Sequence, residues 1–311
     1  MTQSKNKPKL IVTIPAYNEE ETLPEVIKSI PRKLSGVSLT KVLVWSDGST
    51  DGTLEAAKKA GADYVFENKK NLGLAKTFDK ATKMAVELGA DIVVNTDADN
   101  QYDQSQIQLL IEPILNQGAD MVNGDRQVAN LDHMPLSKKY GNILGSLVVR
   151  WLTGVKLNDA SSGFRAYTKE AIQTFSLLSS HTYTHETIIQ AAFKDLFIHE
   201  VPVTFKKRTT GGSRLISGVL PHIKKSGSTI VRTILKYKAF KFFLTFGLLL
   251  LLFGGLIMLR FLYFFFLGDG AGHIQSLIFA SVIISVGLNT VLMGVMADLI
   301  AINRRLVERT Q

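Results

Sequence analysis

Short apolar runs alternate with amphipathic stretches along the first part of the chain. Four runs have the composition of buried strands: Leu10–Ile14, Lys41–Trp45, Tyr64–Phe66 and Ile92–Asn95. The stretches between and after them have helical spacing, at residues 24–30, 51–60, 73–88 and about 104–115. Strands that alternate with helices in this way predict an α/β domain with a mostly parallel sheet. In such sheets, ligands bind at the carboxyl ends of the strands.

The pattern changes at Phe242, after which apolar residues dominate. Phe242–Leu259 and Ile274–Ala297 are uncharged runs, each close to the roughly 20 residues that a bilayer-spanning helix needs. Arg260 and a further apolar stretch extend the first run to residue 267, and only Gly268–His273 separates it from the second. We therefore expect two transmembrane helices, at about 242–267 and 274–297, joined as an antiparallel hairpin.

Basic residues flank both expected spans, whereas the short link carries Asp269 and neither Lys nor Arg. The flanking residues are Arg232, Lys236, Lys238 and Lys241 before the first span, and Arg304, Arg305 and Arg309 after the second. The positive-inside rule then places both chain termini and the α/β domain in the cytoplasm. The sequence thus predicts a multi-pass protein of the inner or plasma membrane.

Residues 216–240 interleave apolar and basic side chains just before the first span. This pattern predicts one or two amphipathic helices that lie in the headgroup layer, with an ordinary surface helix as the alternative. The predicted organisation is an α/β domain at 1–215, interfacial helices at 216–240, two transmembrane helices within 241–303 and a cytoplasmic tail at 304–311.

Composition narrows the possible partners. The chain has no cysteine, which excludes disulfides and thiolate metal sites. Its formal net charge is +9, and the basic residues are most frequent between Lys206 and Lys241, next to the apolar segment. This placement favours a membrane surface over nucleic acid, for which no recognised motif is present.

Polar segments follow three of the expected strands, at Pro15–Glu20, Ser46–Thr53 and Thr96–Gln101. In the third segment, Asp97 and Asp99 stand two residues apart, where they could hold one hard divalent cation. Such a cation would bridge the oxygens of a nucleotide diphosphate, which the bare carboxylates would repel. Taken alone, the segment could equally be a turn with a helix-capping Asp.

Together and in this order, the three segments resemble the family 2 glycosyltransferases with a GT-A (Rossmann-like) fold, over residues 9 to about 215. The resemblance implies that Asp97, Asp99 and Gln101 hold Mg²⁺ or Mn²⁺. It also implies that the donor nucleotide contacts a further set of residues, namely Pro15, Tyr17, Glu19, Asp47 and Asp97. Many relatives have Asp where this chain has Ser46, which leaves the base open.

Four further motifs resemble the polyprenyl-phosphate branch of that family. They are Gly124-Asp125-Arg126, Asp159-Ala160-Ser161-Ser162-Gly163-Phe164-Arg165, Glu200-Val201-Pro202-Val203 and Arg208-Thr209-Thr210-Gly211-Gly212-Ser213-Arg214. The set is similar to dolichyl-phosphate mannosyltransferases and bacterial undecaprenyl-phosphate glucosyltransferases, and the two-helix anchor resembles the latter. It implies transfer of one hexose from a nucleotide sugar to a polyprenyl phosphate, with inversion. A UDP-sugar is the favoured donor and GDP-mannose the alternative.

A lipid phosphate is already an anion at neutral pH, so catalysis requires cations more than a strong base. We therefore expect Arg126, Arg208 and Arg214 to clamp the phosphates, and Arg165, Arg208, Ser213 and Arg214 to bind the acceptor. The expected catalytic set is Asp159, Arg126 and Arg208. Asp159 could orient the acceptor or a sugar hydroxyl, or accept a hydrogen bond from Arg165.

Three rival interpretations remain. A processive polysaccharide synthase would carry Gln-x-x-Arg-Trp, and the match at Leu147–Trp151 lacks the Gln. An oxidoreductase or nucleotide switch would need a glycine-rich phosphate loop, and none occurs. A non-enzymatic membrane adaptor would not need the intact Asp97/Asp99 pair. Homo-oligomers are possible through small residues in the anchor, namely Gly254, Gly255, Gly287 and Gly294.

Overall fold

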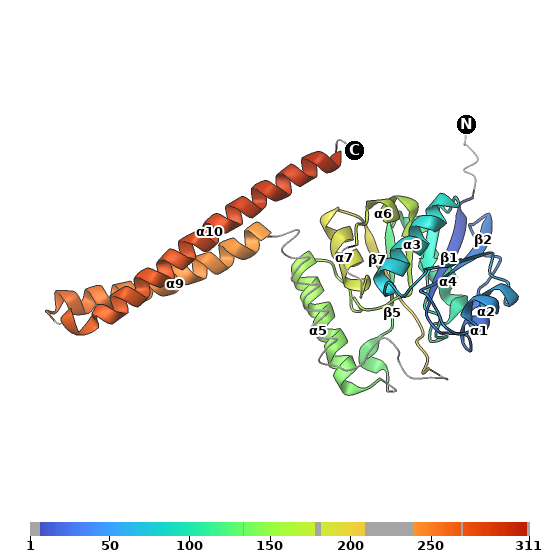
Figure 1. The fold of residues 1–311 in the computed structure, drawn as a ribbon, viewed down its shortest axis with the longest axis horizontal. Coiled ribbons are helices and arrows are strands. Elements are labelled where there is room, and N and C mark those ends of the chain that lie inside the picture. The colour runs from blue at the N-terminus through green and yellow to red at the C-terminus, as the bar shows by residue number, and fades with distance from the viewer. Residues whose placement is uncertain (1–6, 133, 178–181, 209–238, 269, 310–311) are drawn as a thin grey trace. The chain divides into compact units, whose positions relative to one another are not determined.

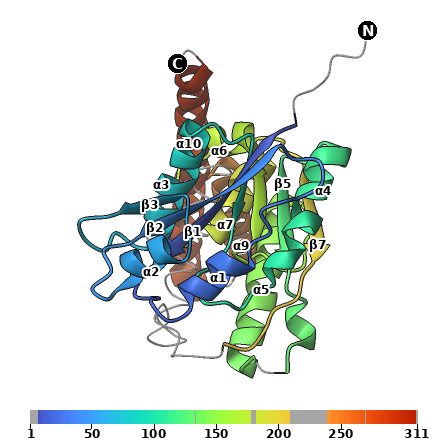
Figure 2. The ribbon, with the colours of Figure 1, turned by 90° about the vertical axis from the view of Figure 1, so that its right-hand side faces the viewer.

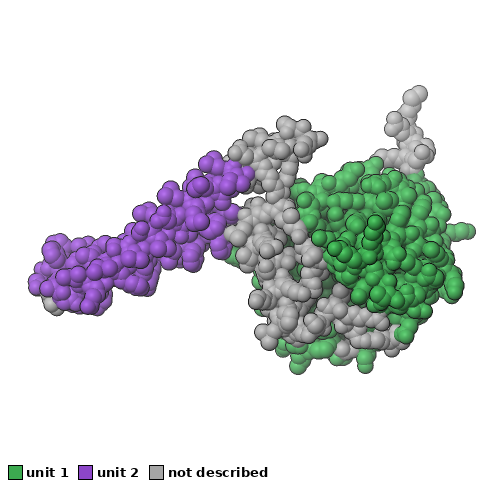
Figure 3. All heavy atoms as spheres, in the orientation of Figure 1, with its two compact units in different colours: residues 1–230 green, residues 231–311 purple. Residues whose placement is uncertain are grey.

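The computed structural model describes residues 7–132, 134–177, 182–208, 239–268 and 270–309, with side chains up to residue 300. The chain divides into two compact units, residues 1–230 and 231–311 (Figure 3). The expected boundary near residue 215 and the expected interfacial helices up to residue 238 lie outside the described residues.

The first unit is built on a seven-stranded sheet with the order β3-β2-β1-β4-β6-β5-β7 (Figure 1). The strands are β1 Lys9–Ala16, β2 Leu39–Ser46, β3 Tyr64–Glu67, β4 Ile92–Asn95, β5 Met121–Asp125, β6 Arg165–Thr168 and β7 Ile198–Pro202. β6 is antiparallel to β4 and β5, and the other strand pairs are parallel. The expectation of a mostly parallel sheet is confirmed.

Helices cover both faces of the sheet (Figure 2). Apolar residues of α1 Leu23–Ser29, α2 Thr53–Lys59 and α4 Ile107–Gln117 pack on one face. Residues of α3 Leu74–Glu87, α5 Leu136–Thr153, α6 Lys169–Thr174 and α7 Thr184–Phe193 pack on the other. Alternate residues of each central strand enter opposite cores. In β1, for example, Val12 faces the first set of helices and Ile11 the second.

The four expected strands and four expected helices are all present, with ends that differ by a few residues. The expectations omitted β5, β6 and β7. These strands are hard to recognise because they lack a run of β-branched residues. β6, for instance, begins with a charged residue, Arg165, which is fully buried.

The described part of the second unit contains α9 Ala239–Phe266 and α10 Ile274–Arg309, with the short 3-10 helix η3 Ala271–His273 between them. By length and composition, both long helices are able to cross a membrane. They include residues 242–266 and 274–297 of the two expected spans. Most of their large apolar side chains are exposed, as lipid-facing side chains would be.

Glycines bring α9 and α10 close together. An added Cβ at Gly247 would lie 2.6 Å from Cγ2 of Val291 and 3.0 Å from the carbonyl oxygen of Gly287. Gly254 similarly faces Ile284 across the pair, at 2.7 Å. These glycines therefore serve contact within one hairpin, where small residues allow close helix packing in membranes.

Gly247→Ala should destabilise this helix pair, because the new methyl group would overlap Val291. We expect a loss of about 1–3 kcal/mol, measured as a lower Tm of the full chain in detergent by circular dichroism. Gly255→Ala is the matched control, since an added Cβ there meets nothing within 4 Å. Equal losses in the two variants would contradict the described packing.

Candidate active site

The polar segments after β1, β2 and β4 meet at the carboxyl edge of the sheet. The three strands are neighbours, and their loops are joined by backbone bonds such as Asp47 N to Ala16 O, at 2.8 Å. Two residues of these loops, Asn18 and Asn100, adopt left-handed backbone angles, with φ of 54° and 57°. Such angles cost energy in non-glycine residues and are frequent at functional sites.

Asp97 and Asp99 follow β4 and lie close enough to affect each other's ionisation. Burial and the charge of Asp99 together raise the pKa of Asp97 to about 7, against the opposing charge of Arg126. Burial also raises the pKa of Asp99, while Arg208 acts in the opposite direction. The main-chain nitrogen of Gln101 donates to Asp99 at 3.2 Å. This pair is therefore a concentration of negative charge that is only partly compensated.

Arg208 reaches this pair from a segment far along the chain. Its Nη2 donates to both carboxylate oxygens of Glu19, at 2.7 and 2.8 Å, and its Nη1 lies 3.7 Å from Asp99. The segment before Arg208 is fixed beside the aspartates, because Lys206 N donates to Gln101 O at 2.7 Å and Gln101 Nε2 donates to Lys206 O at 3.0 Å. Glu19, Asp99, Gln101 and Arg208 therefore form one contiguous group.

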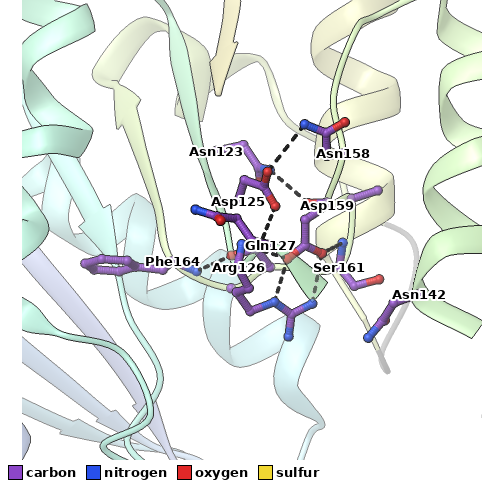
Figure 4. Close-up of polar contacts among 12 residues, drawn as sticks. Asn123, Asp125, Arg126, Gln127, Asn142, Asn158, Asp159, Ser161 and Phe164 are labelled. Atoms are coloured by element: carbon purple, nitrogen blue, oxygen red, sulfur yellow. Dashed lines mark hydrogen bonds and ion pairs between the residues drawn. The ribbon is translucent and has the colours of Figure 1, made fainter. Parts of the chain in front are cut away.

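Arg126 and Asp159 form a second ion pair (Figure 4). Nε of Arg126 donates to Oδ2 of Asp159 at 2.6 Å, and Nη2 donates to Oδ1 at 2.9 Å. The side chains are only 10% and 1% exposed. Burial acts to raise the pKa of Asp159, but the charge of Arg126 and the hydrogen bonds from Arg126 and Ser161 together outweigh it, so the net shift is downward. Burial likewise opposes ionisation of Arg126, and Asp159 reverses that effect and raises the pKa.

Glu200 supports Asp159 from the neighbouring strand β7. Its carboxylate accepts hydrogen bonds from the main-chain nitrogens of Asn158 and Asp159, at 2.7 and 3.2 Å, and from Nδ2 of Asn123, at 2.9 Å. Asn123 also donates to the carbonyl oxygen of Asp159 at 2.8 Å. The sequence indicated Glu200 only as part of a motif, and it did not indicate Asn123. Both act by positioning Asp159.

Arg165 does not stand where an acceptor ligand would. It is fully buried, and its guanidinium donates to the carbonyl oxygens of Thr184 and Ala160 and to the hydroxyl of Thr187, at 2.7 to 2.9 Å. A side chain without exposed surface cannot contact a lipid phosphate, so the expected role of Arg165 in binding the acceptor is corrected to a structural one. The expected option that Asp159 accepts from Arg165 is replaced by the pair with Arg126.

The residues expected to contact the nucleoside have different surroundings. Pro15 is buried within β1, so it shapes the loop rather than offering a surface. Tyr17 is exposed at the edge of the site. Asp47 is buried and accepts hydrogen bonds from Asn68 Nδ2, Leu72 N and Gly73 N, at 2.8 to 2.9 Å. Asp47 therefore ties the loop before α3 to the site. The expected ligands Ser213 and Arg214 lie outside the described residues.

Two tyrosines that sequence reasoning did not select line the floor beneath Asp97. Tyr102 Oη accepts a hydrogen bond from Gly163 N at 3.0 Å, and Tyr183 Oη accepts one from Asn95 Nδ2 at 2.8 Å. Gly163 packs so tightly that an added Cβ would lie 2.9 Å from both carboxylate oxygens of Asp97. Tyr102 could have been recognised as a site residue because it directly follows Gln101, whereas nothing in the sequence around Tyr183 indicates a role at the site.

Comparisons with known proteins show the family of the chain. The family described as Glycosyl transferase family 2 matches residues 11–175. The UDP-N-acetylglucosamine–dolichyl-phosphate N-acetylglucosaminyltransferase of Methanococcus voltae is 32% identical over 62% of this chain and 84% of its own. The undecaprenyl-phosphate mannosyltransferase of Micrococcus luteus is 29% identical over 68% of this chain and 89% of its own.

A solved structure shares the fold. It is the glucosyl-3-phosphoglycerate synthase of Mycobacterium tuberculosis, in complex with Mn²⁺, UDP and glucosyl-3-phosphoglycerate. The similarity has a TM-score of 0.55 at 21% identity and covers 73% of this chain and 79% of the other. At this identity the likeness shows the GT-A fold alone, which confirms the expected fold class.

Asp159→Ala should destabilise the chain by about 3–5 kcal/mol, because it leaves Arg126 charged and buried without its partner. Urea unfolding of the full chain in detergent measures this loss. Since the pKa of Asp159 is lowered on folding, its stabilising effect holds above the unfolded pKa of about 4 and is lost as the pH falls through the folded value. The difference between wild type and variant should therefore shrink in acid.

The control is Asp79→Ala, which removes an exposed ion pair with Lys83 at 2.9 Å. Exposed pairs contribute little, so its loss should stay below about 1 kcal/mol. Equal losses in both variants would show that Arg126 and Asp159 do not form a buried pair in solution.

Proposed function

Because the chain belongs to glycosyl transferase family 2, we propose that it transfers a single hexose from a nucleotide sugar to the phosphate of a polyprenyl lipid. The observation that carries the proposal is the pairing of Asp97 and Asp99 with Arg126 and Arg208 at the carboxyl edge of the sheet. Relatives named for dolichyl-phosphate and undecaprenyl-phosphate acceptors support the lipid substrate.

The oxygen ligands at the site suit a divalent cation. Asp97 and Asp99 offer the hard oxygen ligands that Mg²⁺ and Mn²⁺ accept. Within the described part of the chain, no group of three or more acidic or histidine side chains could enclose a metal alone. A cation at this pair would therefore take its other ligands from water and the donor diphosphate, as Mg²⁺ does in many phosphate sites. When bound, it would supply charge neutralisation for the departing diphosphate.

Charge balance supports the same assignment. The guanidinium of Arg208 lies beside Glu19 and Asp99, and Arg126 lies near Asp97. Burial nevertheless raises the pKa of both aspartates, and the charge of Asp99 adds to the rise at Asp97. A divalent cation at the pair would offset the cost of ionising both carboxylates.

The chain's own groups then have distinct tasks. Glu19 holds the guanidinium of Arg208 beside the aspartates, where it is positioned to face the phosphates of the donor. Arg126, aligned by Asp159, places a second positive charge next to Asp97. The acceptor phosphate is itself an anion and attacks without a strong general base, so one displacement inverts the sugar carbon. In this proposal Arg126 and Arg208 bind phosphate, and Asp159 is a positioning residue.

The proposed donor is a UDP-sugar, with the exposed Tyr17 beside the nucleoside and Asp47 holding the neighbouring loop. We further propose that α9 and α10 cross the membrane, with both termini in the cytoplasm. The apolar length of the two helices and their basic flanks support this placement. The catalytic unit would then work at the cytoplasmic face.

Membranes containing the full chain should incorporate label from a UDP-sugar into a lipid that organic solvent extracts. The assay supplies polyprenyl phosphate with radiolabelled UDP-glucose, UDP-N-acetylglucosamine or GDP-mannose in separate reactions. If only GDP-mannose labels the lipid, the donor carries guanine and the proposed UDP-sugar is wrong. Label in a polymer instead of a lipid would overturn the proposed function.

Asp99→Asn should lower transfer by about 100-fold or more, because it removes one charged ligand of the cation. The variant should keep the wild-type circular dichroism spectrum and lose the rise in Tm that Mn²⁺ gives the wild type. Asp91→Asn is the control, since Asp91 immediately precedes β4 at its opposite end. Full activity of Asp99→Asn would refute the metal assignment.

A further inference from the structure

The helix α5 presents apolar side chains outward. Its exposed large residues are Leu136, Tyr140, Leu144, Leu147 and Trp151, and the Trp151 side chain is 81% exposed. At 3.6 residues per turn, these five positions fall within a sector of about 80° on the helix surface. The pattern is the reverse of an ordinary surface helix, whose outward face is polar.

The outward residues are not required to hold α5 in place. The opposite side of the helix packs on the domain through the buried residues Ser146, Val149 and Leu152. Ser146 accepts a hydrogen bond from Ala160 N at 2.9 Å, and Gly145 faces His185 of α7 so closely that an added Cβ would lie 3.3 Å from its Nε2. Among the described residues of the first unit, the apolar stripe is therefore not needed for packing and can serve another contact. In Figure 1, α5 (green) runs along the margin of its unit.

The chemistry around the stripe favours a lipid surface. Trp and Tyr are the aromatic residues that concentrate at the boundary between headgroups and acyl chains. Lys139 and Arg150 follow one border of the stripe, about 40–60° around the helix from its edge. Nζ of Lys139 donates to the carbonyl oxygen of Ala129 at 2.8 Å, which leaves its other two N–H groups for an anion. Anionic headgroups attract such basic residues, and the chain as a whole carries a net charge of +9.

We propose that the outward face of α5 docks on the bilayer surface, with Leu144, Leu147 and Trp151 among the acyl chains and Lys139 and Arg150 among anionic headgroups. The contact is separate from the helices α9 and α10. It gives the first unit a membrane contact of its own, which holds the α/β domain against the leaflet that contains the acceptor lipid.

The chain has two tryptophans, and this allows a direct test. Trp45 is buried, stacked on Phe66 with ring centroids 5.1 Å apart. The variant Trp45→Phe leaves Trp151 as the single reporter in the full chain. The chain is placed in nanodiscs that contain anionic lipid, with bromine atoms either on the upper part of the acyl chains or absent. Emission and its quenching by aqueous iodide are then recorded.

We expect the Trp151 emission to be quenched at least about twofold by brominated acyl chains and shielded from iodide, because interfacial helices bury their apolar face about 5–10 Å deep. The variant Trp151→Phe, which leaves Trp45, should show no bromine effect. Replacing Leu144 and Leu147 together by Glu should restore iodide access to Trp151. The matched substitution Leu109→Glu, at an exposed apolar position on α4, should not.

Two results would overturn the proposal. Equal iodide quenching in nanodiscs and detergent would show that α5 stays in water. Shielding from iodide without bromine quenching would show that protein covers the stripe, as a second copy or the segment 216–238 of this chain would do. These readouts need no sugar transfer, so they can fail independently of the proposed function.

A kinetic readout follows if the chain transfers sugar as proposed. The double Glu variant should raise KM for a long-chain polyprenyl phosphate several-fold, with kcat and the KM for a short, water-soluble prenyl phosphate unchanged. A fall in kcat on the soluble acceptor would indicate damage to the site rather than loss of docking.

Discussion

Repulsion between like charges is the constraint around which the site is built. Asp97 and Asp99 leave β4 two residues apart, and burial together with their mutual repulsion raises the pKa of Asp97 to about 7. Two guanidinium groups offset this repulsion, and each of them lies near two carboxylates. Arg208 lies between Asp99 and Glu19, and Arg126 lies near Asp97 and is paired with Asp159. Each guanidinium is thus held by a carboxylate of its own and is preorganised toward the acidic pair.

The antiparallel strand β6 is what makes this arrangement possible. Arg165, its first residue, pairs in register with Asn95 of β4 and Asn123 of β5. Because β6 runs the opposite way, the loop that enters it lies at the edge where β4 and β5 leave the sheet. That loop carries Asp159 and Gly163. A parallel strand at this position would bring its carboxyl end there instead, and Asp159 would have no route to Arg126. The buried guanidinium of Arg165 secures the entry of the loop through its bonds to main-chain oxygens.

The sequence contains enough to predict half of the sheet and the location of the site, because both depend on local pattern. The strands β1, β2 and β4 are apolar runs, and the acidic pair stands directly after one of them. The ion-pair partners could not be predicted in the same way. Glu19 and Arg208 are 189 residues apart, and Arg126 and Asp159 are 33 apart, so only the folded sheet selects them. The motifs also placed both Arg126 and Arg165 at the site, in catalysis and in acceptor binding, whereas burial shows that Arg165 is structural.

A similar limit applies to α5. Its apolar residues extend over about 240° of the helix surface, so the sequence pattern alone does not say which of them face outward. Only the packing of Ser146 and Val149 against the domain shows that the aromatic stripe is the unused face. The mean hydropathy of the chain, +0.13, does not reveal this arrangement, because it averages a polar site with exposed apolar helices.

An enzyme that joins a water-soluble donor to a lipid phosphate needs both a polar and an apolar surface on one molecule. The acceptor phosphate lies in the headgroup layer, so the polar edge of the sheet has to reach that layer while its charges stay out of hydrocarbon, where leaving them unpaired would be costly. A shallow apolar face such as that of α5 satisfies both requirements, because it limits how deeply the domain can enter the bilayer.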